Sequence, residues 1–293
     1  MRLLFVRHGD PDYKKDCLNE IGVREARALA ALGPQIGWGT CFVSPLGRAQ
    51  ETAAIVLGRA VPGAHGVAAA VGCTDLSMRD TGSNALGADA SGAGLLKTLD
   101  WLQEFPAQVD PGAAELLQDA FYFKKNADGS PKNRVVWDMY PAYYHEHPAY
   151  SDYNEWRTTP VALHSDAVSV YDRIIRSFDE FLAERGYVRE GRHYRVEREN
   201  TETITLFCHF GVSCVLLSRL WNVSPFVPLQ SLCMPTSSVT ELYTEERQKG
   251  IAHFRTTRIG DTTHLTMAGL KPERLPHSAL FAEVYSDFSK RHD

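Results

Sequence analysis

Met1-Arg-Leu-Leu-Phe-Val-Arg-His-Gly9 is the most informative segment of the chain. Residues 3–6 are apolar and predict a buried β-strand, and the Arg7-His8-Gly9 triplet follows directly at the carboxyl end of that strand. Open α/β sheets bind their ligands outside the carboxyl ends of their strands. We therefore expect a site here, with His8 as a nucleophile, Arg7 as an anion clamp, and Gly9 allowing close approach of the backbone.

Strand-like and helix-like segments alternate after this triplet. Residues 18–34 predict a helix with Asn19 as its N-cap, and residues 40–43 predict a second buried strand. A second helix is predicted to begin with Ser44 as its N-cap and to end at Gly58. A strand followed by a helix, twice in succession, is typical of an α/β protein.

The middle of the chain differs in composition and in hydrophobic periodicity. Residues 60–94 are rich in Gly and Ala with weak periodicity, whereas residues 97–102 predict a third strand. From about residue 105 to 164 the sequence is irregular and dense in aromatic side chains, which favours a packed insertion over a linker. Within it, residues 120–137 predict a hairpin that turns near Asp128-Gly129.

The C-terminal part returns to the alternating pattern. Its predicted elements are a long helix capped by Ser165 and ended by Gly186, a buried strand over 203–208, a helix over 212–221, strands over 238–242 and 251–257, and a terminal helix over 279–290. The strand over 203–208 again delivers a polar residue, His209, at its carboxyl end. This part of the chain therefore repeats the arrangement seen at His8.

Composition limits the classes of partner and compartment. With 293 residues, 44% hydrophobic content, a net charge of −5 and a pI near 6.1, the chain gives no general reason to bind nucleic acid or an acidic membrane. Its six cysteines form no C-x-x-C pair, so buried free thiols and a reducing cytoplasm are expected. No segment approaches the ~20 apolar residues of a membrane span, and the apolar N-terminal stretch is too short for a signal peptide.

Polar side chains follow three of the predicted strands. Arg7 and His8 follow the first, Arg48 lies in the first turn of the helix after the second, and His209 follows the strand over 203–208. Parallel strands would gather these side chains along one edge of the sheet. Two guanidinium groups suit a tetrahedral dianion such as phosphate, because each can donate paired hydrogen bonds to its oxygens.

Five segments together resemble the histidine phosphatase superfamily, also called the phosphoglycerate mutase-like family. In family order they are Arg7-His8-Gly9, Leu18-Asn-Glu-Ile-Gly22 before an alanine-rich helix, Ser44-Pro-Leu-Gly-Arg48-Ala-Gln-Glu-Thr52, Cys208-His209-Phe210-Gly211-Val212, and Gly260-Asp-Thr-Thr-His-Leu265, which looks like the family's closing hairpin. The fold that this resemblance implies is a three-layer α/β/α sandwich with a mostly parallel central sheet. We expect a single domain over 1–293, with the aromatic-rich insertion at about 105–164 as a lid over the site.

The resemblance implies a phosphohistidine mechanism. His8 would attack phosphorus, while Arg7, Arg48 and His209 would hold the phosphoryl oxygens, with Gly9 and Phe210 also in contact with substrate. A neutral imidazole is a competent nucleophile near pH 7, and phosphoryl transfer depends mainly on positioning and charge neutralisation. No metal and no cofactor are expected.

A general acid must protonate the leaving alkoxide. Glu104 is our candidate, because it lies at the end of the predicted third strand, where the family places its acidic residue. The surrounding sequence departs from the commonest family pattern, so Asp100, Glu115 and Asp138 remain competing candidates.

The expected function is that of a metal-independent phosphomonoesterase acting on a small phosphorylated metabolite through a phosphohistidine on His8. Asp10-Pro11 replaces the Glu-Ser or Glu-Thr pair common in mutases, which favours hydrolysis. A phosphoglycerate mutase-type phosphotransferase and a non-catalytic phospho-ligand sensor remain the alternatives. The sequence leaves the oligomeric state and the substrate open, and it favours surface positions over ligand roles for His145-Glu-His147 and for Lys124-Lys125.

Overall fold

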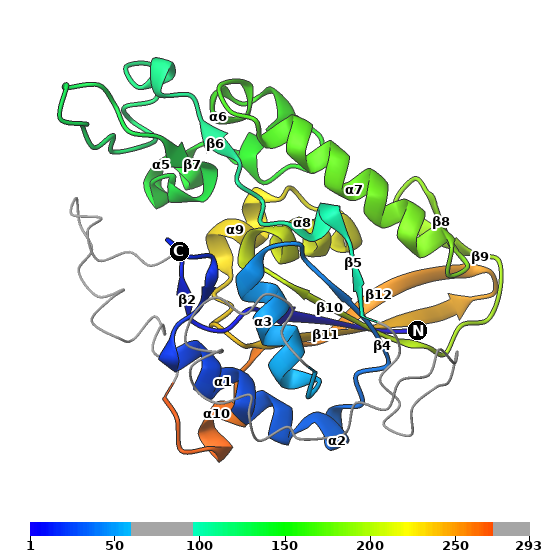
Figure 1. Cartoon of the computed structure of the whole chain (residues 1–293). Helices are drawn as coiled ribbons and strands as arrows, with labels where there is room; N and C mark the ends of the chain where they lie inside the picture. Colours follow the sequence, from blue (N-terminus) through cyan, green and yellow to red (C-terminus); the bar gives the residue numbers. More distant parts are fainter. Residues whose placement is uncertain (60–95, 272–293) are drawn as a thin grey trace.

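An eight-stranded sheet forms the centre of the molecule (Figure 1). The computed structural model describes residues 1–59 and 96–271. Across the sheet the strand order is β5-β4-β10-β1-β11-β12-β9-β8. The bounds of these strands are Lys97–Thr98 (β5), Thr40–Val43 (β4), Thr203–Cys208 (β10), Arg2–Arg7 (β1), Val239–Gln248 (β11), Ile251–Asp261 (β12), His193–Val196 (β9) and Tyr187–Glu190 (β8).

The first four strands in this order are parallel and form the half of the sheet that the sequence predicts. In the register of β1 with β10, Arg7 pairs with Cys208, so His8 and His209 leave their strands at the same level. Phe207 in turn pairs with Val43 of β4, which brings the start of the loop after β4 to the same edge. The shared carboxyl edge therefore exists as predicted, because the strands end in register.

The other four strands form an antiparallel half that extends the sheet. The sequence predicted strands over 238–242 and 251–257, but β11 and β12 are longer, and the hairpin of β8 and β9 was not predicted. The added length of β11 and β12 is charged and exposed, and a cross-strand ion pair at 3.1 Å between Glu245 and Arg255 supports it. Such polar segments lack the apolar alternation from which strands are predicted.

Helices cover both faces of the sheet, which confirms the three-layer α/β/α arrangement (Figure 1). On one face lie α1 (Glu20–Ala31), α2 (Gly33–Ile36), α3 (Gly47–Val56) and α10 (Thr263–Met267); on the other lie α7 (Ala167–Ala183), α8 (Phe210–Trp221) and α9 (Phe226–Ser231). Alternate side chains of β1 pack against the helices on opposite faces of the sheet. Leu3 and Phe5 belong to the larger core cluster beside α7 and α8, whereas Leu4 and Val6 belong to the cluster beneath α1 and α3.

Three predicted helix starts are wrong by one or two residues, although the helices exist. Helix α3 begins at Gly47 instead of after Ser44, because the Asp16 carboxylate accepts a hydrogen bond from the Gly47 N–H at 2.7 Å. The N-cap of α7 is Asp166 instead of Ser165, and α8 begins two residues early, at Phe210. Helix α1 has the predicted N-cap, since Asn19 accepts from the Gly22 N–H, but it ends at Ala31 and the chain continues into α2.

The predicted strand over 97–102 is wrong in its second half. Strand β5 has only two residues, and a 3₁₀ turn, η2 (Asp100–Leu102), follows it. Trp101 packs against Phe178 and Phe181 of α7, and Leu102 is fully buried in the same cluster. Two consecutive side chains cannot reach one face from a strand, so the backbone turns here.

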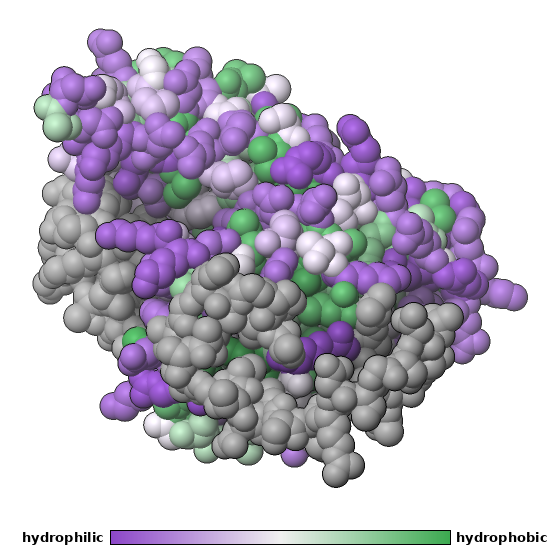
Figure 2. Space-filling model, viewed as in Figure 1, coloured by the Kyte–Doolittle hydropathy of each residue, from purple (hydrophilic) through white to green (hydrophobic). Residues whose placement is uncertain are grey.

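Residues 105–164 form short elements at the end of the molecule where β1 terminates (Figure 1). These are β6 (Gln108–Val109), η3 (Pro111–Ala113), β7 (Arg134–Val135), η4 (Val136–Asp138), α5 (Pro141–Glu146), η5 (Pro148–Tyr150), η6 (Glu155–Thr158) and α6 (Pro160–Leu163). Many of their aromatic side chains are core residues, as expected: Tyr150 and Trp156 are buried against Phe226 of α9. The outer surface of this region is mostly hydrophilic (Figure 2).

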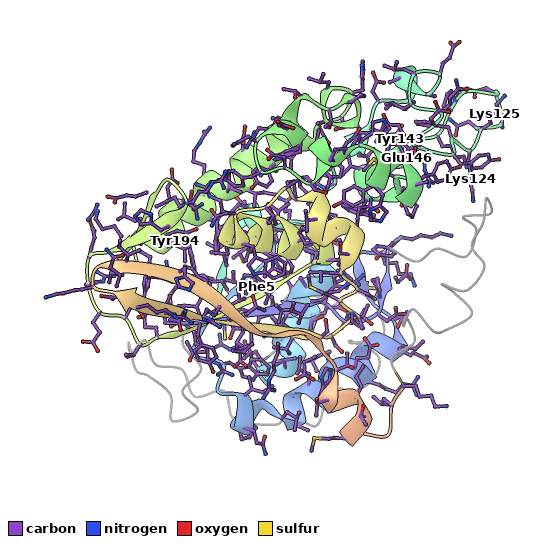
Figure 3. The ribbon with its side chains drawn as sticks, turned by 180° about the vertical axis from the view of Figure 1, so that it is seen from behind. Phe5, Lys124, Lys125, Tyr143, Glu146 and Tyr194 are labelled. Atoms are coloured by element: carbon purple, nitrogen blue, oxygen red, sulfur yellow. The ribbon has the colours of Figure 1, made fainter. Side chains whose placement is uncertain are left out.

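The hairpin predicted over 120–137 is replaced by a different pairing. A tight turn does form near Asp128, with Gly129 at φ +85°, but only a single bridge between Lys125 and Pro131 closes it. Strand β7 instead pairs with β6. Lys124 and Lys125 consequently lie at the outer tip of the region (Figure 3).

Two predicted regions, 60–94 and the terminal helix over 279–290, lie outside the described residues. The segment 260–265 is not a hairpin: Gly260 and Asp261 end β12, and α10 begins at Thr263. Five cysteines fall in the described ranges, all free thiols, of which Cys233 is exposed and the other four are buried. Among residues 1–59 and 96–271, none of the helices is long and apolar enough to cross a membrane.

Candidate active site

His8 is a buried, neutral imidazole with one nitrogen held by the backbone. Only 1% of the residue is exposed, and its Nδ1 lies 2.7 Å from the Gly9 carbonyl oxygen. Because a carbonyl can only accept, Nδ1 carries the proton and the lone pair of the neutral ring is on Nε2. Burial, followed by the nearby His209, Arg7 and Arg48, holds the pKa of His8 well below its usual value.

Two guanidinium groups lie beside this imidazole. Arg7 Nη1 donates to the Met234 carbonyl at 2.5 Å, and its carbon Cζ lies 5.6 Å from the centre of the Phe210 ring. Arg48, in the first turn of α3 as predicted, forms an ion pair with Asp16. Within residues 1–59 and 96–271, the buried Nε atoms of both arginines have no hydrogen-bond partner, so each retains a donor that a bound anion can use.

His209 faces His8 across the edge of the sheet. The ring centroids of the two histidines are 5.1 Å apart, and His209 is fully buried at the N-terminus of α8. Its Nε2 lies 2.7 Å from Ser44 Oγ, whereas its buried Nδ1 has no partner among the described residues. Burial and the charges of Arg48 and Arg7 hold the pKa of His209 well below its usual value, so this ring is also neutral near pH 7.

Glu104 brings a carboxyl group to the same place. Its Oε1 accepts from the N–H groups of Phe105 at 2.9 Å and Val212 at 3.2 Å, which seats it on the first turn of α8. Burial raises the pKa of Glu104, although both hydrogen bonds and the charges of Arg7 and Arg48 act in the opposite direction. A carboxyl group with a raised pKa, close to two arginines, has the properties of a general acid.

The three competing acids do not share this environment. Asp100 and Glu115 are exposed, and Asp138 forms an ion pair at 2.8 Å with Arg134 within the 105–164 region. Of the four carboxyl groups considered from the sequence, the structure places Glu104 where the charges of Arg7 and Arg48 act on it.

Gly9 and Phe210 also lie at this edge. A Cβ on Gly9 would stand 2.7 Å from the carbonyl oxygen of Gly22, so only glycine permits the close contact between this loop and α1. The Phe210 ring lies between Arg7 and the 105–164 region, where Trp137 meets it edge-on at 6.2 Å. Phe210 therefore forms part of the rim of the site.

Sequence reasoning missed the side chains that hold these groups in place. Ser44 contacts His209, Asp16 contacts Arg48, and Thr52 Oγ1 accepts the Gly9 N–H at 3.0 Å. Ser44 had a usable signal, because it follows strand β4 just as His8 follows β1. Asp16 had none, since its contact depends on a loop residue at φ +51°.

His145 and His147 do not form a metal site. His147 Nδ1 donates to the Tyr143 carbonyl at 2.7 Å. The rings of Tyr143 and His147 also stack, with their centroids 4.1 Å apart. In the part of the chain that the structure describes, no group of three or more His, Cys, Asp or Glu side chains is arranged to hold a metal ion.

Comparison with known proteins supports the family suggested by the motifs. Residues 3–64 match the sequence model of the histidine phosphatase superfamily (branch 1). No curated protein sequence matches the chain significantly. Among solved structures, a phosphoserine phosphatase variant from Entamoeba histolytica in complex with phosphoserine is similar with a TM-score of 0.50 at 12% identity, over 90% of this chain and 98% of that one.

Two further solved structures are similar at lower scores. A mycobacterial glucosyl-3-phosphoglycerate phosphatase has a TM-score of 0.44 at 15% identity, over 88% of this chain and 97% of its own. A putative α-ribazole-5′-phosphate phosphatase from Escherichia coli has a TM-score of 0.43 at 16% identity, over 89% and 98%. Residues 3–64 therefore match the histidine phosphatase superfamily in sequence, and the chain shares the fold of the Entamoeba protein.

Proposed function

We propose that this protein is a metal-independent phosphomonoesterase that hydrolyses a small phosphorylated metabolite through a phosphohistidine on His8. The observation that carries this proposal is the state of His8: its Nδ1 donates to the Gly9 carbonyl, so the lone pair is on Nε2, beside two arginines. Phosphoryl transfer needs little beyond a positioned nucleophile and charge neutralisation. The two guanidinium groups supply that neutralisation.

In the first step, His8 Nε2 attacks phosphorus in line with the departing oxygen. The N–P bond forms as the P–O bond to the alcohol breaks, and Glu104 donates its proton to the leaving alkoxide. Glu104 Oε1 accepts both backbone N–H groups, which leaves Oε2 to carry that proton. Arg7, Arg48 and the free Nδ1 of His209 donate to the three equatorial oxygens, where the charge of the transition state is concentrated.

In the second step, water attacks the phosphohistidine. Glu104, now a carboxylate, takes a proton from this water while the N–P bond breaks, and inorganic phosphate leaves. His8 returns to its neutral form with Nδ1 still donating to Gly9. The cycle consumes one water and regenerates both the imidazole and the carboxylic acid.

We further propose that the 105–164 region caps the site and selects the substrate. Trp137, in this region, meets Phe210 at the rim, and its buried indole N–H has no partner among residues 1–59 and 96–271. An aromatic surface with a free donor suits the organic part of a phosphorylated metabolite. A single domain over 1–293 and a cytoplasmic location stay predictions.

Hydrolysis of p-nitrophenyl phosphate in the presence of EDTA tests the proposal. We expect wild-type protein to release phosphate at the same rate with and without EDTA, and His8→Ala to be inactive. Activity that EDTA removes, or full activity in His8→Ala, would overturn the mechanism. Phosphoryl exchange between phosphoglycerates with little phosphate release would favour the mutase instead, and an inert protein that binds vanadate would favour the sensor.

A further inference from the structure

Glu25 is a buried carboxylate that the proposed mechanism does not use. It lies on α1, and only 2% of the residue is exposed. Gly22, one turn earlier, is where the α1 backbone touches the loop after β1: a Cβ there would stand 2.2 Å from the Asp10 carbonyl oxygen. Burying a carboxylate costs free energy unless hydrogen bonds compensate for the lost water, so the contacts of Glu25 matter.

The two oxygens of Glu25 bind two different loops. Oε2 accepts the backbone N–H of Asp10 at 2.9 Å, and Oε1 accepts the hydroxyl of Thr236 at 2.9 Å. Asp10 lies two residues after His8, in the loop that leaves β1. Thr236, 1% exposed, lies in the segment that leads into β11. Glu25 therefore joins both loops to α1.

Both loops hold the groups that the mechanism uses. The segment around Thr236 supplies the Met234 carbonyl that accepts from Arg7 Nη1 at 2.5 Å. The same segment supplies the Ser237 N–H, which donates to the His8 carbonyl at 2.9 Å. A movement of this segment would consequently displace both the nucleophile and the arginine beside it.

We infer that Glu25 is a positioning residue, whose carboxylate clamps the Asp10 and Thr236 loops to α1 and so fixes His8 and Arg7 relative to each other. The inference rests on the proposed function. Glutamine should serve in place of glutamate: its carbonyl can accept the Asp10 N–H, and its amide can donate to the Thr236 hydroxyl, which is free to rotate and accept. Alanine would leave the buried Asp10 N–H without that acceptor.

The test compares Glu25→Gln, Glu25→Ala and the matched control Glu20→Ala, an exposed glutamate in the first turn of the same helix. kcat and KM for p-nitrophenyl phosphate are measured well below the unfolding temperature of each variant. We expect Glu25→Ala to lose about 10- to 100-fold in kcat with KM within about threefold, because small displacements of reacting groups cost rate more than binding. Glu25→Gln and Glu20→Ala should stay within about threefold of wild type in kcat.

Folded Glu25→Ala with wild-type kcat would overturn the inference, as would equal losses in the Gln and Ala variants. If Glu25→Ala does not fold, Thr236→Val removes one of the two hydrogen bonds with little change in shape, and a kcat equal to wild type would then be the contradicting result. Orthovanadate affinity separates this inference from the proposed function. If the wild-type protein binds vanadate but does not hydrolyse the ester, the proposed activity is wrong. In that case an unchanged vanadate affinity in Glu25→Ala would also contradict the positioning role of Glu25. Failure of the wild type to bind vanadate at all would overturn both.

Discussion

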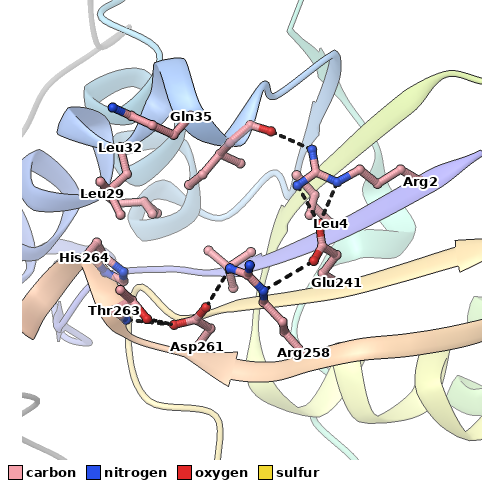
Figure 4. A pocket seen from close by; sticks show the side chains of 12 residues that line it. Arg2, Leu4, Leu29, Leu32, Gln35, Glu241, Arg258, Asp261, Thr263 and His264 are labelled. Atoms are coloured by element: carbon pink, nitrogen blue, oxygen red, sulfur yellow. Dashed lines mark hydrogen bonds and ion pairs between the residues drawn. The ribbon is translucent and has the colours of Figure 1, made fainter.

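Two arginines lie at each of two separate places in this molecule. Arg7 and Arg48 stand at the carboxyl edge of the parallel strands, whereas Arg2 and Arg258 line a pocket of about 210 Å³ between α1, α2 and the β11–β12 pair (Figure 4). In that pocket the guanidinium groups are paired: Arg2 lies 2.5 Å from Glu241, and Arg258 lies 3.1 Å from Asp261. Both acids are ionised, because hydrogen bonds and nearby arginines lower the pKa of Glu241 and Asp261 against the opposing effect of burial.

The arginines at the carboxyl edge are paired with acids less completely. Arg48 has Asp16, but Arg7 donates to a backbone carbonyl, and burial raises the pKa of the neighbouring Glu104. Both histidines between them are neutral. Positive charge is therefore compensated only in part at the edge, where Arg48 pairs with Asp16, and more fully in the pocket. The pairing of the arginines with acids, and not the number of arginines, identifies the place that suits a phosphate.

The largest expected effect is the loss of the nucleophile. His8→Ala should lower kcat for p-nitrophenyl phosphate by about 10⁴-fold or more, since it removes the imidazole that forms the covalent intermediate in the proposed mechanism. Arg258→Ala, at the paired pocket, is the matched control and should stay within about twofold of wild type, as an exposed ion pair contributes little. Steady-state assays of both purified variants make this comparison. A comparable loss in Arg258→Ala would mean that the two places had been assigned wrongly.

The next largest effect distinguishes Arg7, at the carboxyl edge, from Arg2, in the pocket. Arg7→Ala should lower kcat/KM by about 10²- to 10³-fold, because it removes a donor to the transition-state oxygens. Arg2→Ala should leave kcat/KM near wild type and lower stability instead, since it leaves the Glu241 carboxylate with fewer partners. Kinetics and urea unfolding of the same preparations test both halves. Similar losses of kcat/KM in the two variants would contradict the assignment of the phosphate site to the carboxyl edge and not to the pocket.

Glu104→Gln tests the proton donor. The variant should lose about 10²-fold in kcat on an alkyl phosphate, whose leaving group needs a proton, and far less on p-nitrophenyl phosphate, whose leaving group is a stable anion. The ratio of the two rates is the measurement. Equal losses on both substrates would indicate that Glu104 only positions α8 and its neighbours.

The smallest expected effect concerns stability and comes from Glu25. Burial, aided by the charge of Asp10, raises the pKa of Glu25 to about 7, although the hydrogen bonds from Thr236 and Asp10 and the charge of Arg7 act against it. Below pH 4.5 the carboxyl is protonated in both the folded and the unfolded chain, and it costs nothing. As pH rises from about 4.5 to about 7, the unfolded chain loses this proton first, so folding stability falls by about 3 kcal/mol.

Glu25→Gln carries no such penalty. Its free energy of unfolding should match wild type near pH 4.5 and exceed it by up to about 3 kcal/mol at pH 8. Urea unfolding at the two pH values measures the difference. An advantage of the variant that is the same at both values would contradict a raised pKa for Glu25.

Sequence reasoning reached the parts of the site that depend on strand ends. His8 and His209 could be predicted because each comes directly after a buried strand, and Arg48 because it lies in the first turn of the helix after β4; the register of the strands then brings their ends together. The continuous apolar run of β1 likewise predicts a strand that is buried on both faces. Glu104 was placed at the end of a strand over 97–102, whereas a 3₁₀ turn over 100–102 lies between the short strand β5 and Glu104.

The parts that could not be predicted depend on contacts between distant segments. Asp16 and Glu25 act through loops whose conformation no local pattern specifies, and Ser44 was assigned to a helix cap that Asp16 supplies instead. The region over 105–164 consists of elements too short to show periodicity, held by aromatic contacts with α9. Its density of aromatic residues predicted packing but not topology.

The stereochemical course at phosphorus tests the central claim most directly. A chiral phosphorothioate ester hydrolysed in isotopically labelled water reports whether the configuration is kept or inverted, and each in-line displacement inverts it once. Two displacements, first by His8 Nε2 and then by water, predict overall retention. Overall inversion would mean that water attacks the ester directly, and it would contradict a phosphohistidine on His8.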